Sequence, residues 1–171
     1  MLDFQFNQGV GSQNAFIDIG GFGSTGGSLS GSPTYNGGAS GNLTGTVHIV
    51  NSDPVLNEYL QNFTAGTAFQ FQIAFGGLKM TAPDGTSTDS FGLAFYKGSD
   101  FTMPQLNDGS QGDFFFEIDV NGDGSTTVNQ ASSPKGLVTA APVLTPEPGT
   151  LVLLGVGLGV VVLRRRAGRA G

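Results

Sequence analysis

Apolar residues alternate with polar or small residues along much of the chain, and a two-residue period is the spacing of side chains on one face of a β-strand. In the clearest run, Phe69, Phe71, Ile73 and Phe75 fall on one face. No segment shows a helical pattern of comparable quality, although Asp53-Pro54 is suited to start one helical turn within 55–63. The same strand period recurs in the runs 2–6, 15–19, 47–49, 91–95 and 114–120.

Clusters of Gly, Ser, Asn and Asp separate these runs, which is typical of antiparallel strands joined by turns. Charged residues make up only 12% of the chain and cysteine is absent, so the core must come from apolar side chains. All 14 phenylalanines lie between residues 4 and 116 and are suited to supply it. We therefore expect an all-β fold, an antiparallel and jelly-roll-like β-sandwich over residues 1–131. The glycine- and serine-rich stretch 21–33 is expected to form a flexible loop.

Charge is distributed unevenly along the chain. Residues 1–144 contain 12 acidic residues and 3 lysines, a net charge of −9, whereas four arginines lie in the last eight positions. A body this acidic repels phosphate backbones and lacks the basic surface that counterion release requires. The composition therefore excludes nucleic acid as a partner of residues 1–144.

The C-terminal tail has three ordered parts. Residues 132–150 contain four prolines and are expected to form a stalk that ends in Pro146, Glu147 and Pro148. The next thirteen residues carry no charged or hydrogen-bonding side chain, and as a helix they would be about 20 Å long. Residues 164–171 form a basic tail that begins with Arg164, Arg165 and Arg166. The apolar run consists of Leu151, Val152, Leu153, Leu154, Gly155, Val156, Gly157, Leu158, Gly159, Val160, Val161, Val162 and Leu163.

This run is shorter than the roughly 30 Å hydrocarbon core of a bilayer, but its context favours a membrane anchor. It lies near the chain end, follows helix-breaking prolines and precedes arginines that can reach the headgroups. We therefore expect a short transmembrane helix over 151–163. By the positive-inside rule, 164–171 would form a cytoplasmic tail and the body would lie on the outer side.

The order Pro-Glu-Pro, short apolar helix, arginine cluster resembles the PEP-CTERM sorting signal of Gram-negative bacteria. This resemblance covers roughly residues 145–167. It implies an exported protein that is held transiently in the inner membrane, where an exosortase recognises Pro146, Glu147 and Pro148 and cleaves the chain. It also implies a final place at the cell surface or in the extracellular matrix, in bacteria that make extracellular polysaccharide, biofilm or floc.

The body is similar to a group of small, uncharacterised β-rich PEP-CTERM proteins. The similarity lies in the stretches 2–7, 82–88, 91–96 and 114–128. In that group the first of these strands follows a signal peptide and some further residues. We therefore expect an in-frame upstream extension that encodes a signal peptide, and a stop codon directly before Met1 in the genomic DNA would contradict this expectation.

One stretch has the start of a calcium-binding loop. Asp119, Asn121 and Asp123 occupy positions 1, 3 and 5, and Gly124 occupies position 6. Position 12 is Gln130 instead of a bidentate glutamate, and strands are expected on both sides in place of helices. The favoured interpretation is a hairpin turn without calcium, and a weak extracellular calcium site is the alternative.

Candidate catalytic groups are few. His48 is the only histidine, lies on an expected strand facing away from Val47 and Ile49, and has no nucleophile elbow to serve. Glu117 and Asp119 share one face of a strand, which is ordinary for a solvated surface. The Gly-x-Gly-x-x-Gly pattern at 21–26 lacks the following helix that a dinucleotide site needs. We expect no catalytic residue, no cofactor and no enzyme activity.

The sequence thus predicts an exported, non-enzymatic protein of the cell surface or matrix, associated with biofilm or exopolysaccharide. Its expected partners are exosortase, the inner membrane and extracellular polysaccharide. The alternative is a carbohydrate-binding module, with or without help from calcium. Sugar sites usually present aromatic rings to solvent, and this chain has no tryptophan and only Tyr35, Tyr59 and Tyr96 besides phenylalanine.

Overall fold

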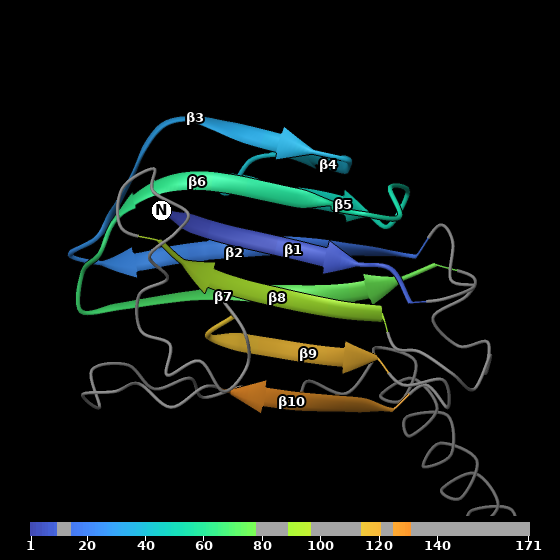
Figure 1. The fold of residues 1–171 in the computed structure, drawn as a ribbon. Coiled ribbons are helices and arrows are strands. Elements are labelled where there is room, and N and C mark those ends of the chain that lie inside the picture. The colour runs from blue at the N-terminus through green and yellow to red at the C-terminus, as the bar shows by residue number, and fades with distance from the viewer. Residues whose placement is uncertain (10–14, 78–88, 97–113, 121–124, 131–171) are drawn as a thin grey trace, which may run out of the picture. The chain divides into compact units, whose positions relative to one another are not determined.

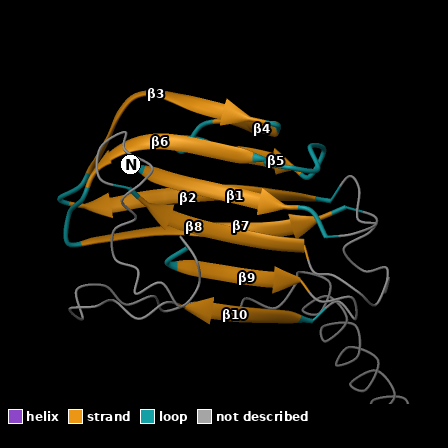
Figure 2. Ribbon diagram, viewed as in Figure 1, coloured by secondary structure: helices purple, strands orange, loops and turns teal. Residues whose placement is uncertain are grey.

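A computed structural model describes residues 1–9, 15–77, 89–96, 114–120 and 125–130, all within one compact unit, Met1–Ala140. These residues form β-strands joined by turns and loops (Figures 1 and 2). None of them lies in a helix that could cross a membrane. The strands are β1 (Leu2–Asn7), β2 (Phe16–Thr25), β3 (Ser28–Asn36), β4 (Gly38–Gly41), β5 (Val47–Val50), β6 (Glu58–Thr64), β7 (Ala68–Gly76), β8 (Asp89–Phe95), β9 (Phe116–Val120) and β10 (Thr126–Gln130).

The strands form two antiparallel sheets, one in front of the other in Figure 1. Sheet A has six strands in the order β10-β9-β8-β1-β6-β3, and sheet B has four in the order β4-β5-β2-β7. The predicted all-β antiparallel fold is therefore confirmed. Strands β9 and β10 pair antiparallel, and the predicted turn at 121–124 lies outside the described residues. The jelly-roll connectivity stays a prediction, and the predicted helix over 151–163 lies outside the described residues.

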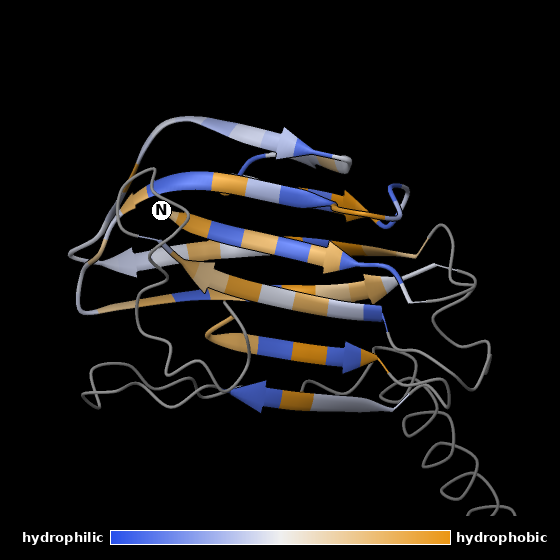
Figure 3. Cartoon of the chain, in the orientation of Figure 1, coloured by the Kyte–Doolittle hydropathy of each residue, from blue (hydrophilic) through white to orange (hydrophobic). Residues whose placement is uncertain are grey.

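The core lies between the two sheets, where alternate residues of facing strands meet. On β1, Leu2, Phe4 and Phe6 are fully buried, and Figure 3 shows the matching bands of hydrophobic and hydrophilic residues along this strand. The phenylalanine rings connect the layers directly. Phe4 on β1 meets Phe71 on β7 with ring centroids 5.3 Å apart, and Phe69 on β7 meets Phe95 on β8 at 5.5 Å. The face predicted from the alternation is thus the buried one.

The alternation predicted for 114–120 is wrong at its start. Phe116, Ile118 and Val120 face the core, but the ring of Phe114 lies over Gly92, on the opposite face of sheet A. The reason is an irregularity before β9. The N–H of Phe115 donates to the carbonyl of Leu93, and Phe116 also pairs with Leu93, so two consecutive residues lie opposite one.

Two other local predictions are wrong. The helical turn expected within 55–63 is absent, because Asp53 Oδ1 accepts the N–H groups of Val55 and Leu56 in a tight turn and the chain then enters β6. The flexible loop expected at 21–33 is instead the end of β2 and most of β3. Glycine there fits strands whose backbone hydrogen bonds, and not their side chains, hold them to β7 and β6.

Candidate functional site

The predicted sorting and anchoring residues all lie outside the described residues. This applies to Pro146, Glu147 and Pro148, to the apolar run Leu151–Leu163, and to Arg164, Arg165 and Arg166. The geometry of the described residues therefore bears only on the β domain. Within it, three places carry polar groups or a hollow: the acidic face of β9, the outer face of sheet B and a shallow hollow at the ends of β2 and β7.

The predicted calcium ligand Asp119 lies on the outer face of β9, and Asn121 and Asp123 lie outside the described residues. Asp119 Oδ2 accepts a hydrogen bond from Asn129 Nδ2 on β10 at 2.7 Å. A cation at this carboxylate would have to share the oxygen with that amide. No group of three or more metal-binding side chains is found among the residues that the structure describes.

Glu117 lies beside Asp119 on the same face, as predicted. Partial burial raises the pKa of the Glu117 carboxyl, repulsion from Asp119 raises it further, and a hydrogen bond with Ser90 opposes both effects. The charged form of Glu117 is therefore disfavoured in the folded protein relative to the unfolded chain. The ionised Glu117 carboxylate therefore destabilises the fold at neutral pH.

Glu117→Gln is expected to raise the melting temperature by about 1 to 2 °C at pH 7. The gain should shrink as the pH falls and vanish below about pH 4, where the glutamate is protonated in both the folded and the unfolded state. Thermal melts of both proteins from pH 3.5 to 7 would measure this. A gain of equal size at every pH would contradict the electrostatic cause.

The second place is the outer face of sheet B, where Phe16, Asp18 and His48 lie together. Asp18 on β2 pairs directly with His48 on β5, and Asp18 Oδ1 lies 2.7 Å from His48 Nδ1. Both side chains are 41% exposed. The Phe16 ring centroid lies 5.0 Å from that of His48, with the ring planes at 42°. The structure thus places His48 on the predicted face and gives it a carboxylate partner.

Small residues surround this group. Gly76 on β7 pairs with Phe16, and a side chain at Gly76 would collide with the Phe16 ring, so the ring lies over the bare backbone there. Ala74 pairs with Asp18, and Ser40 on β4 pairs with His48. The aromatic ring and the histidine–aspartate pair therefore stand on a floor of small side chains.

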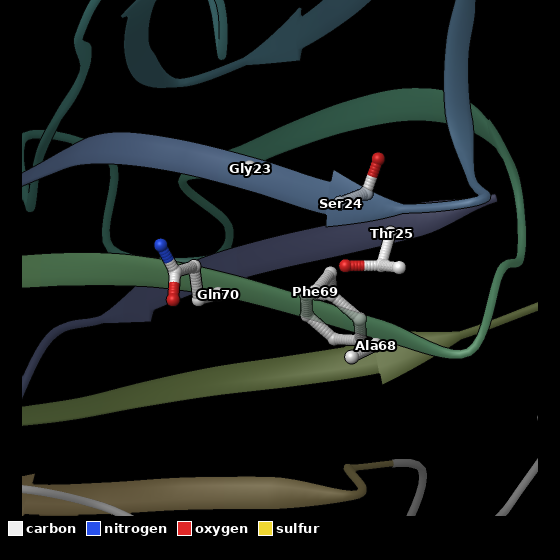
Figure 4. A pocket seen from close by; sticks show the side chains of 6 residues that line it. All are labelled: Gly23, Ser24, Thr25, Ala68, Phe69 and Gln70. Atoms are coloured by element: carbon white, nitrogen blue, oxygen red, sulfur yellow. The ribbon is translucent and has the colours of Figure 1, made fainter.

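The third place is a hollow of about 310 Å³ at the ends of β2 and β7 (Figure 4). It is open to solvent, and Ser24 already donates its hydroxyl to the carbonyl of Gly27 at 2.9 Å. It is lined by two hydroxyl groups, one amide and one ring, and none of its lining residues is an acid or a base that could activate a hydroxyl group. The residues that line the hollow are Gly23, Ser24, Thr25, Ala68, Phe69 and Gln70.

Phe16 was not predicted as a surface aromatic. The signal was present, because Ala15, Ile17 and Ile19 were predicted to face the core and are fully buried. The same two-residue period places Phe16 and Asp18 on the other face. Pairing with His48 was not visible in the sequence, because it depends on the register of β2 with β5.

Residues 144–166 match the model of the PEP-CTERM protein-sorting motif. The match includes the Pro-Glu-Pro triplet, the apolar run and the first three arginines, so the resemblance of the tail is confirmed. The motif implies export and processing by exosortase. No curated protein and no solved structure matches the chain. The similarity of the body to small β-rich PEP-CTERM proteins stays a prediction.

Proposed function

We propose that this chain is a cell-surface or extracellular-matrix protein whose C-terminal signal is cleaved by exosortase, and that it acts in a biofilm or exopolysaccharide matrix. The observation that supports this is the motif match at residues 144–166. In the proposed route the run 151–163 holds the chain in the inner membrane with 164–171 in the cytoplasm. Exosortase then cuts near Pro146-Glu147-Pro148 and releases the β domain to its destination.

Replacing Pro146, Glu147 and Pro148 together by alanine is expected to block processing. In a host that contains an exosortase, both chains are expressed behind a secretion signal peptide. An epitope tag after Gly171 should then be lost from the native sequence and kept on the variant, as seen on an immunoblot of membrane fractions. Pro142→Ala, which changes a proline of the predicted stalk outside the matched segment, is the control and should be processed normally. Equal processing of the native chain and the triple variant, or persistence of the tag on the native chain, would contradict the proposal.

We also propose that the β domain is non-enzymatic and works without a cofactor. Two observations support this. The chain's one histidine is engaged with Asp18 on an open sheet face, and the hollow between β2 and β7 is lined by no titratable residue. The calcium site at Asp119, Asn121 and Asp123 remains the alternative proposal for this part of the chain.

Carbohydrate binding is the second candidate function. The observation that favours it is Phe16, a partly exposed ring on the outer face of sheet B with hydrogen-bonding groups beside it. From the sequence alone, one of the tyrosines was the expected ring for stacking on a sugar. Of the tyrosines, Tyr59 is fully buried, Tyr96 is almost so, and Tyr35 is 42% exposed but donates its hydroxyl to the carbonyl of Gly41.

A further inference from the structure

The outer face of sheet B has an unusual chemical character for a protein surface. Its four strands contain one acid, Asp18, one histidine, His48, and no lysine or arginine. Protein surfaces usually carry about 25 to 35% charged residues. A surface with so little charge does not recruit a partner by long-range electrostatics, so a partner must be recognised by contact.

We propose that this face binds a neutral polysaccharide. The Phe16 ring would stack on the C–H face of a sugar, and His48 and Asp18 would hydrogen-bond to the hydroxyl groups around it. We call these three residues the sheet B patch. The proposal deepens the second candidate function, and its biological meaning rests on the proposed export to a polysaccharide matrix.

The ring supplies the stacking surface. Phe16 lies over Gly76, where the lack of a side chain lets it rest on the sheet, and it remains partly exposed. The C–H groups of a sugar carry a partial positive charge and are attracted to the negative face of an aromatic ring. The neighbouring side chains, Ala74 and Ser40, are short, so an extended chain of sugars can lie flat on the strands.

In the proposed complex, the His48–Asp18 pair beside the ring would orient the sugar through hydrogen bonds. With the proton of His48 on Nδ1, that N–H donates to Asp18 and leaves Nε2 as an acceptor for a hydroxyl group. The second carboxylate oxygen of Asp18 is a further acceptor. Because the two side chains hold each other at 2.7 Å, little side-chain entropy remains to be lost when a ligand binds.

Charge decides which polysaccharide fits. Residues 1–144 carry a net charge of −9, and the patch itself contains a carboxylate. An anionic polymer such as one rich in uronic acids would be repelled, and no lysine or arginine of the four strands compensates. A peptide or lipid surface would need more apolar area than one phenylalanine and the partly buried Val50 provide. A neutral glycan can form hydrogen bonds with the patch without charge repulsion and without needing a large apolar contact area.

The test is native affinity electrophoresis of the full chain in lauryldimethylamine oxide, a detergent without a sugar headgroup. Hydroxyethyl cellulose and dextran are the neutral probes, and alginate is the anionic probe. At least one neutral polymer should retard the native chain and alginate should not. Phe16→Leu and His48→Ala should each weaken retardation about tenfold, whereas Phe16→Tyr and the matched control Gln70→Ala, on the same face, should leave it unchanged.

Any of the following results would overturn the proposal: no retardation by either neutral polymer, unaltered retardation of both Phe16→Leu and His48→Ala, or equal retardation by alginate. A melting curve of each variant shows whether it is folded. If Phe16→Leu does not fold, His48→Ala alone still tests the proposal. Adding a calcium chelator should change nothing, because Asp119 lies on the other sheet; loss of binding would also count against the patch. Processing of the C-terminal tag is measured separately, so failure here leaves the sorting proposal intact.

Discussion

Asn57→Ala is expected to lower the free energy of unfolding by about 3 to 5 kcal/mol, although it removes only one small polar side chain. Asn57 is fully buried between the two sheets. Its Oδ1 accepts from the N–H groups of Gly38 at 3.0 Å and Asp53 at 2.9 Å. Its Nδ2 donates to the carbonyls of Phe6 at 3.3 Å and Asp53 at 2.7 Å. One side chain thus ties β1 of sheet A to the start of β4 in sheet B.

Alanine would leave these backbone groups without their partner in a buried or partly buried site, and each unsatisfied group costs about 1 to 3 kcal/mol when it is fully buried. The melting temperature of the full chain should fall by about 10 °C or more. Asn62→Ala is the matched control, because Asn62 is an exposed asparagine on the adjoining strand β6, and its effect should stay within about 0.5 kcal/mol. A loss below 1 kcal/mol for Asn57→Ala would show that water replaces the amide at little cost.

The role of Asn57 also shows where sequence reasoning stops. Strands β1, β2, β7 and β8 were predictable because large apolar residues recur in each of them with period two. Strand β6 has no such pattern: Glu58 and Leu60 face one side, Tyr59 and Gln61 the other, and all four are buried. Since each buried face of β6 carries one apolar and one polar residue, the alternation from which a strand is recognised is lost.

Strand β3 was missed for a different reason. It is mostly exposed at the edge of sheet A, and its register with β6 shifts between Ser30 and Thr34. At this shift, the side-chain amide of Gln61 donates through Nε2 to the carbonyl of Ser30 at 2.7 Å and to the carbonyl of Gly31 at 3.2 Å. A strand held by its backbone and by one side chain from its neighbour leaves almost no hydropathy signal of its own.

The sheet B patch was predictable only in part. The period of β2 placed Phe16 and Asp18 on the outer face, but only the register of β2 with β5 brings His48 to them. The sorting motif could be recognised without knowledge of the fold, because its three parts follow one another along the chain. The sorting motif was therefore predictable because it is local in sequence, and the full composition of the patch was hidden because it depends on strand pairing.

Phe4→Ala should destabilise the domain by about 3 to 5 kcal/mol, through lost apolar burial and the cavity left behind. Phe4 is fully buried on the central part of sheet A, and its ring lies 5.3 Å from Phe71 at 86° and 6.2 Å from Phe91 at 30°. Phe4→Leu keeps most of the volume and should cost clearly less than alanine. Val55→Ala is the control, because Val55 is 85% exposed and its truncation removes no core contact.

The Phe4–Phe71 contact also tests how the two sheets face each other. Phe4 belongs to sheet A and Phe71 to the edge strand of sheet B, so their edge-to-face contact exists only if β1 and β7 lie opposite as described. A double-mutant cycle with Phe4→Leu and Phe71→Leu should give a coupling energy of about 0.5 to 1.5 kcal/mol. Chemical denaturation of the four proteins measures it. Strict additivity would mean that the layers pack in another alignment. The sheet B patch does not depend on that alignment, because its neighbours come from the pairing of β2 with β5 and β7 within one sheet.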